Sequence, residues 1–300
     1  MKNPTPTPPP GPAPEHFPAP WASDWGEDPY GLWQSLTYRG VRQAFRWLPP
    51  GRFLMGSPEN EHARYDDELQ HEVILTRGFW LAETTCTQAL WQAVMGMNSS
   101  SFEGDRRPVE TVSWNEVQDF IEQLNGAVPE LAARLPTEAE WEYACRAGTT
   151  TPFSFGEDIT PEQVNYQGNY PYRGSMKGQY RGKTVEVASL PVNPWGLYEM
   201  HGNVWEWCQD WYAKDSVVDP TGPATGEGRV LRGGSWINVG RRVRSAYRNH
   251  GEPGNRDALI GFRLALGPEL RQDERAGGDE GGAGQTAREK RRRAGPAERK

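Results

Sequence analysis

Helical spacing of apolar residues is clearest around residues 113–126. Ser113-Trp114-Asn115-Glu116 has the form of a capping box, in which the serine hydroxyl and the glutamate carboxylate bond free backbone N–H groups at a helix start. The apolar residues that follow lie three or four positions apart: Val117, Phe120, Ile121 and Leu124. This spacing gives a single apolar stripe and predicts a helix that ends at Gly126.

Two further helices are predicted from similar signals. Residues 137–140, Thr-Glu-Ala-Glu, form a second capping box, followed by apolar residues on one face and then by Gly148. Before these two, a helix is expected to begin near Thr85 or Thr87 and to end at Gly96.

Short apolar runs between turn residues predict strands. Residues 45–48 and 53–55 flank Pro49-Pro50-Gly51, which predicts two short strands around a turn. Residues 73–75 and 79–81 repeat this pattern around Arg77-Gly78. From residue 150 to residue 266 we expect short strands and long ordered loops. Helices first and irregular strands afterwards indicate the α+β class.

The composition is that of a globular protein and argues against several other classes. The 300 residues include 13 Trp and 34 Gly, so we expect a core built from aromatic side chains and tight turns. No apolar run reaches the ~18 residues that suggest a transmembrane helix. The N-terminal residues lack the apolar segment of a secretory signal. The net charge of −7 argues against specific nucleic-acid binding.

Composition also divides the chain into four parts. Residues 1–20 contain nine prolines and are expected to form a disordered lead, and residues 21–39 an ordered lead-in. Residues 40–266 are expected to form one domain. Residues 267–300 hold nine Lys or Arg against seven acidic residues, which predicts a disordered charged tail, with a basic docking patch as the alternative. Without this tail, 24 positive and 33 negative charges remain, so the body is acidic, near −9.

Several long motifs resemble one known family. They lie at residues 51–57, 134–144, 196–207, 232–236 and 260–263. In this order they resemble the formylglycine-generating enzymes, also called sulfatase-modifying factors. The resemblance covers residues 45–266 and implies the irregular variant of the C-type lectin-like fold.

The cysteines bear on whether this chain is an oxidase. The resemblance implies copper(I) held by two cysteines shortly after the Gly-Gly-Ser motif, since Cu(I) prefers soft thiolates. Here the first of these positions is Asn238, and no cysteine follows Cys208. Cys86, Cys145 and Cys208 are too few for a disulfide framework, and we expect three buried, inert thiols. Copper-dependent oxidation is therefore not expected, and no cofactor is expected to be required.

A calcium site is also implied by the resemblance. The ligands it implies, backbone carbonyls and carboxylates, map onto Glu199, Gly202, Val204 and Glu206. Oxygen ligands of this kind suit calcium. The alternative is that Glu206 only fixes a loop.

Residues 229–263 resemble the variable region of proteins that are diversified by retroelements, many of which share the lectin-like fold. In such systems template adenines are randomised, so that the asparagine codon AAC becomes any NNC codon. The residues expected to form a diversified ligand-binding surface are Trp236, Ile237, Asn238, Val239, Gly240, Arg242, Tyr247, His250, Gly251, Asp257, Ala258 and Leu259. Nine of them can be encoded by an NNC codon: Ile237, Val239, Gly240, Arg242, His250, Gly251, Asp257, Ala258 and Leu259. Asn238 fits an unaltered template codon, and Trp236 and Tyr247 are expected to supply contact area. The arginines between them are expected to hold the loops by hydrogen bonds.

The sequence therefore favours a non-catalytic protein that binds a protein or cell-surface ligand through residues 236–259. The alternative is a modifying oxidoreductase of the same family with an atypical site. A third hypothesis is a structural or regulatory module that docks on a partner through the tail, residues 267–300. With no signal segment visible, a cytoplasmic location is the default expectation, and surface display stays open.

Overall fold

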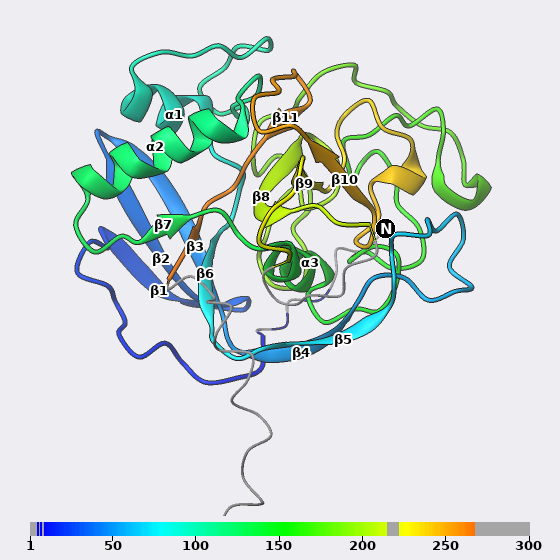
Figure 1. Cartoon of the computed structure of the whole chain (residues 1–300), viewed down its shortest axis with the longest axis horizontal. Helices are drawn as coiled ribbons and strands as arrows, with labels where there is room; N and C mark the ends of the chain where they lie inside the picture. Colours follow the sequence, from blue (N-terminus) through cyan, green and yellow to red (C-terminus); the bar gives the residue numbers. More distant parts are fainter. Residues whose placement is uncertain (1–4, 6, 8, 215–221, 268–300) are drawn as a thin grey trace, which may run out of the picture. The chain divides into compact units, whose positions relative to one another are not determined.

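The computed structural model describes residues 5, 7, 9–214 and 222–267, all of which belong to one compact unit, Met1–Glu269 (Figure 1). The predicted tail from residue 268 onward lies outside the described residues. The described part is α+β, as predicted.

A six-stranded sheet carries the N-terminal half of the fold. Its strands, in spatial order, are β1 (Asp24–Asp28), β2 (Gly31–Tyr38), β3 (Val41–Leu48), β6 (Phe79–Ala82), β12 (Ala265–Leu266) and β7 (Ala133–Arg134). Because β12 lies between β6 and β7, residues near the end of the described chain form an inner strand of the sheet whose edge strand is β1. Helices α1 (Gln88–Met95) and α2 (Trp114–Ala127) contact each other and pack beside β3 and β7 respectively (Figure 1).

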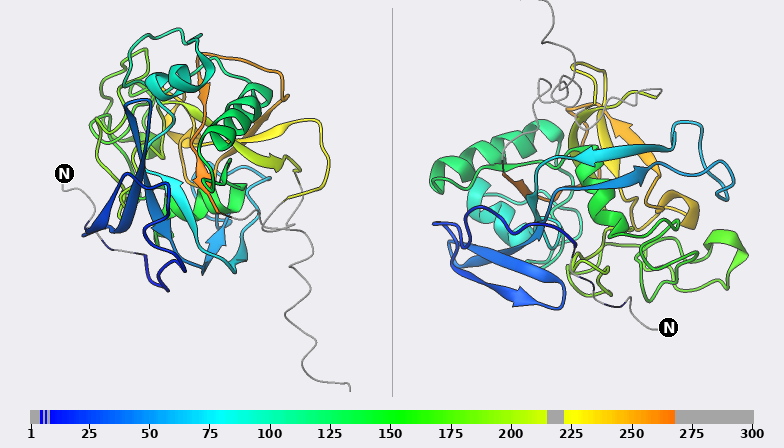
Figure 2. Two further views of the ribbon diagram at one scale, coloured as in Figure 1. Left: turned by 90° about the vertical axis from the view of Figure 1, so that its left-hand side faces the viewer. Right: turned by 90° about the horizontal axis from the view of Figure 1, so that it is seen from below.

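A second sheet holds the region singled out in the sequence. Its order is β10 (Arg248–Gly251), β9 (Arg229–Arg232), β8 (Trp205–Trp211) and β11 (Ile260–Gly261), with β11 parallel to β8. Helix α3 (Glu138–Arg146) contacts β8 and β9 on one side and the ribbon of β4 (Gly51–Met55) and β5 (His71–Leu75) on another (Figure 2).

The helix predictions are confirmed by the caps. Thr87, Ser113 and Thr137 each accept a backbone N–H bond as N-cap, and the latter two complete capping boxes. Helix α2 runs past the predicted end at Gly126 and stops at Ala127, because Gly126 does not adopt the left-handed conformation of a helix-ending glycine and the extended Val128 is the C-cap instead.

The strand positions are confirmed, but the predicted turns do not make hairpins. β3 pairs with β6 and β4 pairs with β5, so the chain crosses from one sheet to the other at residues 49–50 and again near Gly78. Proline has no N–H to donate, which disfavours pairing across Pro49-Pro50. At the second crossing, a side chain on Gly78 would lie 2.3 Å from the ring of Trp47. The four strands therefore form one long bent ribbon.

Described residues of the N-terminal lead contact the body. Phe17 stacks on Trp80 with ring centroids 5.8 Å apart, and the indole of Trp47 donates to the Pro12 carbonyl at 2.9 Å. The reason is aromatic burial, since Phe17 is partly buried against the core. Residues 24–38 supply β1 and β2, so the ordered sheet begins before residue 40.

Candidate binding face

Four buried or nearly buried arginines hold the segment 229–263 in place. Arg232, Arg244 and Arg263 are fully buried, and the side chain of Arg248 is 11% exposed. Each forms an ion pair with a glutamate from a distant part of the chain. The expectation that arginines hold these loops is confirmed for these four. The fifth expected arginine, Arg256, is exposed, and its ion pair with Glu116 at 2.8 Å lies at the surface.

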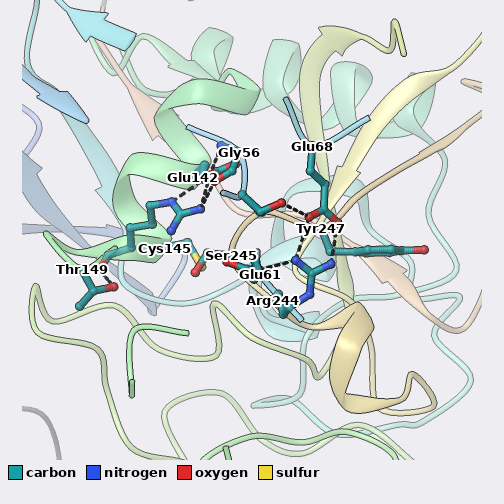
Figure 3. A network of polar contacts seen from close by, with 12 residues as sticks. Gly56, Glu61, Glu68, Glu142, Cys145, Thr149, Arg244, Ser245 and Tyr247 are labelled. Carbon is teal, nitrogen blue, oxygen red and sulfur yellow. Dashed lines mark hydrogen bonds and ion pairs between the residues drawn. The ribbon is translucent and has the colours of Figure 1, made fainter. Parts of the chain in front are cut away.

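Arg244 lies at the centre of the densest of these networks (Figure 3). Its guanidinium donates to both carboxylate oxygens of Glu68 at 2.6 and 2.8 Å and to Glu61 at 2.5 Å. It also donates to the carbonyls of Ala63 and Arg241 at 3.2 and 3.0 Å. One side chain thus joins the 61–68 loop to the loop after β9. These carboxylates raise the pKa of Arg244 further above its ordinary value, in spite of burial.

Arg232 and Arg248 join the same segment to α3. Arg232 pairs with Glu142 and donates to the carbonyls of residues 245–247, the longest of these bonds being 3.1 Å. Arg248 forms a two-point contact with Glu138 at 2.7 and 2.8 Å. Bidentate pairs of this kind fix orientation as well as position. The path of residues 244–248 is therefore set by α3.

Arg263 forms an ion pair with Glu206, whose carboxylate would be a ligand in the expected calcium site. It donates to both oxygens of Glu206 at 2.6 and 2.7 Å, and Trp141 donates to one of them at 2.7 Å. Glu199 accepts backbone N–H bonds from Ala188 and Leu190 at 3.0 and 3.3 Å. Both carboxylates implied as ligands are therefore already satisfied by protein donors. Among the residues that the structure describes, no cluster of three His, Cys, Asp or Glu could hold a metal ion. The residues present do not fit the implied calcium site, and no function is derived through it.

Glu199 instead gives the fold a pH-dependent contribution. Burial raises its pKa from 4.5 to about 7. A raised folded-state pKa means that the folded protein holds the proton more tightly, so this contribution is complete below about pH 4.5 and is lost as the pH rises through 7. We expect the free energy of unfolding of the wild type to fall by about 3 kcal/mol over that window through Glu199. Glu199→Gln should flatten this dependence.

The measurement is urea unfolding of wild type and Glu199→Gln at several pH values between about 4.5 and 8, which span the ordinary and the raised pKa of Glu199. Two other buried groups titrate alongside Glu199: burial raises the pKa of Asp210 to about 8 and lowers that of His201 to about 4. Both groups are present in wild type and variant, so the difference between their pH dependences of unfolding reports on Glu199 alone. The exposed Glu122→Gln serves as control. Equal pH slopes for wild type and Glu199→Gln would contradict the prediction.

Some of the residues expected on the binding face are exposed. Arg242, His250 and Asp257 are exposed, and Ile237 is 42% exposed. His250 stacks on the ring of Tyr212 at 4.3 Å. These four side chains come from the loop after β9, from β10 and from the loop before β11. The main-chain path between them is fixed by the buried arginines described above.

Three other residues expected on the binding face are instead packed or hydrogen-bonded within the fold. Gly240 is buried, and a side chain on it would lie 2.5 Å from the backbone nitrogen of Tyr172. The Asn238 side chain accepts hydrogen bonds from the amide and hydroxyl of Ser235, both at 2.8 Å. A side chain on Gly251 would lie 2.9 Å from Trp207. The placement of Gly240 corrects the expectation of a varied position, because the site has no room for another residue.

The remaining predicted residues are half-buried. Trp236 lies between Phe102 and Tyr180, with ring centroids 5.5 and 6.2 Å away, and its indole donates to the Ala258 carbonyl at 3.4 Å. Tyr247 packs edge-on against Tyr65 at 5.0 Å. Leu259 is packed against the core, and Val239 lines a groove with residues far away in sequence.

That groove was not predicted from the sequence. It has a volume of about 450 Å³ and is lined by His62, Ala63, Tyr170, Pro171, Tyr172, Arg173, Val239 and Arg241. Three loops contribute these residues. No local sequence signal predicts that these three loops meet. The only hint in the sequence is the cluster of tyrosines and arginines next to Gly and Pro at residues 170–174.

The three cysteines are free and buried, as predicted. Burial raises the pKa of the Cys145 thiol to about 12, which disfavours a reactive thiolate. The described residues contain no helix long and apolar enough to cross a bilayer.

Comparison with known proteins agrees with this architecture. The formylglycine-generating enzyme of Thermomonospora curvata is 36% identical over 196 residues, which are 60% of this chain and 62% of that protein. The chain spans between about half and three fifths of the length of such curated relatives.

Two solved structures have a similar fold. Treponema denticola variable protein 1 is 31% identical with a TM-score of 0.66, covering 79% of this chain and 99% of that one. PvdO from Pseudomonas aeruginosa is 27% identical with a TM-score of 0.65, covering 74% and 93%. The model of the sulfatase-modifying factor enzyme 1-like domain matches residues 39–267. The chain therefore belongs to the family of sulfatase-modifying factor enzyme 1-like domains, with the fold that the sequence motifs predicted.

Proposed function

We propose that this protein is a non-catalytic ligand-binding protein whose loops 236–259 form a binding surface varied by a diversity-generating retroelement. The observation that carries the proposal is that one segment contains two kinds of side chain, buried ones that hold its fold and exposed ones that a ligand can contact. The arginines are buried and paired, whereas Ile237, Arg242, His250 and Asp257 are exposed. Exposed positions on a fixed frame can change without loss of the fold. The likeness to a solved variable protein supports the same reading.

The ligand we propose is a protein or another cell-surface molecule. His250 and Trp236 offer rings, Arg242 and Asp257 offer charges of both signs, and Ile237 offers apolar area. Binding surfaces of adaptable specificity combine aromatic contact area with polar groups in this way.

Exchanging the exposed positions tests the proposal. In the variant Ile237→Ser, Arg242→Ser, His250→Ser and Asp257→Ser, the changes at 237, 242 and 257 are each expected to alter the free energy of unfolding by no more than about 0.5 kcal/mol, because these side chains are exposed. His250→Ser is expected to cost about 1 kcal/mol, because it also removes the ring contact with Tyr212. Gly240→Val is the matched control. It also satisfies the codon rule but meets Tyr172, so a loss of about 1–3 kcal/mol is expected. Thermal and urea unfolding measure both variants.

A four-position variant that unfolds as readily as Gly240→Val would overturn the proposed surface. Diversification itself is tested in the DNA beside the gene. We expect a reverse transcriptase gene and a near-copy of the codons for residues 229–263 that differs only where the copy has adenine. Absence of both would contradict diversification.

The runner-up is a modifying oxidoreductase, which the identity with formylglycine-generating enzymes favours. It predicts copper or iron retained in the purified protein and oxygen uptake on a cysteine-containing peptide. Either result would overturn the non-catalytic reading.

A further inference from the structure

The groove of about 450 Å³ lies between three loops that are held together by hydrogen bonds. The Tyr172 hydroxyl donates to the His62 carbonyl at 2.7 Å, and the Gly240 amide donates to the Tyr170 carbonyl at 3.0 Å. The close packing of Gly240 on Tyr172 adds a third contact. The groove is therefore a formed feature, within the ~300–1,000 Å³ range of ligand sites.

Buried ionic contacts fix two of these loops to each other. Arg244 donates to the backbone carbonyls of Ala63 and Arg241, both of which line the groove. Its other donors are taken by Glu61 and Glu68 (Figure 3). Preorganised walls of this kind reduce the ordering cost of binding.

The charge of the lining is opposite to that of the body. Residues 1–266 carry nine more negative than positive charges, yet the lining contains two arginines, Arg173 and Arg241, and no carboxylate. Arg241 is exposed, and among the described residues no carboxylate forms an ion pair with it. Arg173 forms a solvent-exposed pair with Glu157 at 2.6 Å, which is of small energetic value. The Arg241 guanidinium lies over the Tyr65 ring at 5.7 Å and can turn its N–H donors to a ligand, whereas Arg173 must exchange its pair with Glu157 for the ligand.

The aromatic residues add contact area beside these charges. Tyr170 is 60% exposed, and the rings of His62 and Tyr172 meet edge-on at 5.3 Å. Guanidinium groups bind carboxylates through two parallel hydrogen bonds and stack on flat groups. The lining therefore matches a chain that presents carboxylates next to flat peptide units.

We propose that this groove binds an acidic segment of a protein partner, with Arg173 and Arg241 contacting its Asp or Glu carboxylates. The inference rests on the proposed function and specifies its ligand chemistry, since Val239 and Arg241 lie within the 236–259 surface. Variation at residue 239 would then change how well the acidic segment fits the groove. Arg173 and Arg241, which are not among the predicted varied positions, would stay the same.

The test uses the full chain and a labelled hexaglutamate peptide, with hexaglutamine as the neutral comparison. We expect saturable binding of hexaglutamate alone. Arg241→Gln and Arg173→Gln are each expected to weaken it about tenfold, as for loss of a charge-assisted hydrogen bond. Val239→Trp should weaken it by filling the groove. Arg42→Gln is the matched control, because Arg42 is also exposed and paired with an acid, Asp24 at 3.8 Å, but lies outside the groove.

Three results would overturn the inference. They are no saturable binding of hexaglutamate, an equal loss with Arg42→Gln, and full competition by inorganic phosphate, which would indicate a site for free anions only. None of them depends on the reverse transcriptase or on the stability of the four-position variant. The proposed function can therefore survive the failure of this inference.

Discussion

Replacing Arg244 by methionine is expected to lower the free energy of unfolding by about 3–5 kcal/mol. The substitution keeps much of the side-chain volume but leaves Glu61 and Glu68 buried without their cation. A buried carboxylate without a partner is costly because water no longer solvates its charge. The carbonyls of Ala63 and Arg241 lose a donor as well.

Urea unfolding measures this loss, and two further experiments establish its cause. Combining Arg244→Met with Glu61→Gln and Glu68→Gln removes the unpaired charges and should restore about half of the lost stability. Lowering the pH should also stabilise Arg244→Met relative to wild type, because protonation neutralises the two carboxyls. A loss below about 1 kcal/mol, typical of an exposed pair, would contradict the described network.

Arg263→Met is expected to have an effect of similar size, about 3–5 kcal/mol. It leaves Glu206 fully buried with the Trp141 indole as its remaining donor, and it frees the carbonyls of Ala82 and Tyr198. The double variant with Glu206→Gln should recover part of the loss, since it removes the unpaired charge.

The same unfolding experiment, repeated with calcium and with a chelator, separates the two roles considered for Glu206. A carboxylate held by Arg263 predicts equal stability of the wild type under both conditions. Stabilisation by calcium that disappears in Glu206→Gln would contradict the ion pair and would restore the calcium site.

Local signals in the sequence were enough to locate the helices. Ser113 and Thr137 bond amides three residues away, so a capping box can be recognised without knowing the rest of the fold. Strand pairing could not be recognised in this way. The partners of β3 and β4 lie beyond a 15-residue connection, residues 56–70, whose length hides the pairing of Phe53 with Val73.

The candidate surface was predicted correctly in outline but not residue by residue. Gly240 and Asp257 satisfy the same codon rule, yet only Asp257 is exposed. The difference arises from Tyr172, about seventy residues earlier in the chain, whose backbone occupies the space beside Gly240. The groove was missed for the same reason, since its residues meet only after the three loops have folded together.

The arginine frame has a genetic consequence if this segment is diversified as proposed. Arginine can be encoded as CGC and glycine as GGC, and neither codon contains adenine. Where these residues have such codons, a copying process that alters only adenines would leave Arg232, Arg244, Arg248 and Arg263 intact in every descendant, together with the two glycines after Arg232. Asparagine-derived positions would change freely in the same round. Residues that hold the fold by charge would thus be shielded at the level of the nucleotide, and each new variant would inherit a foldable scaffold.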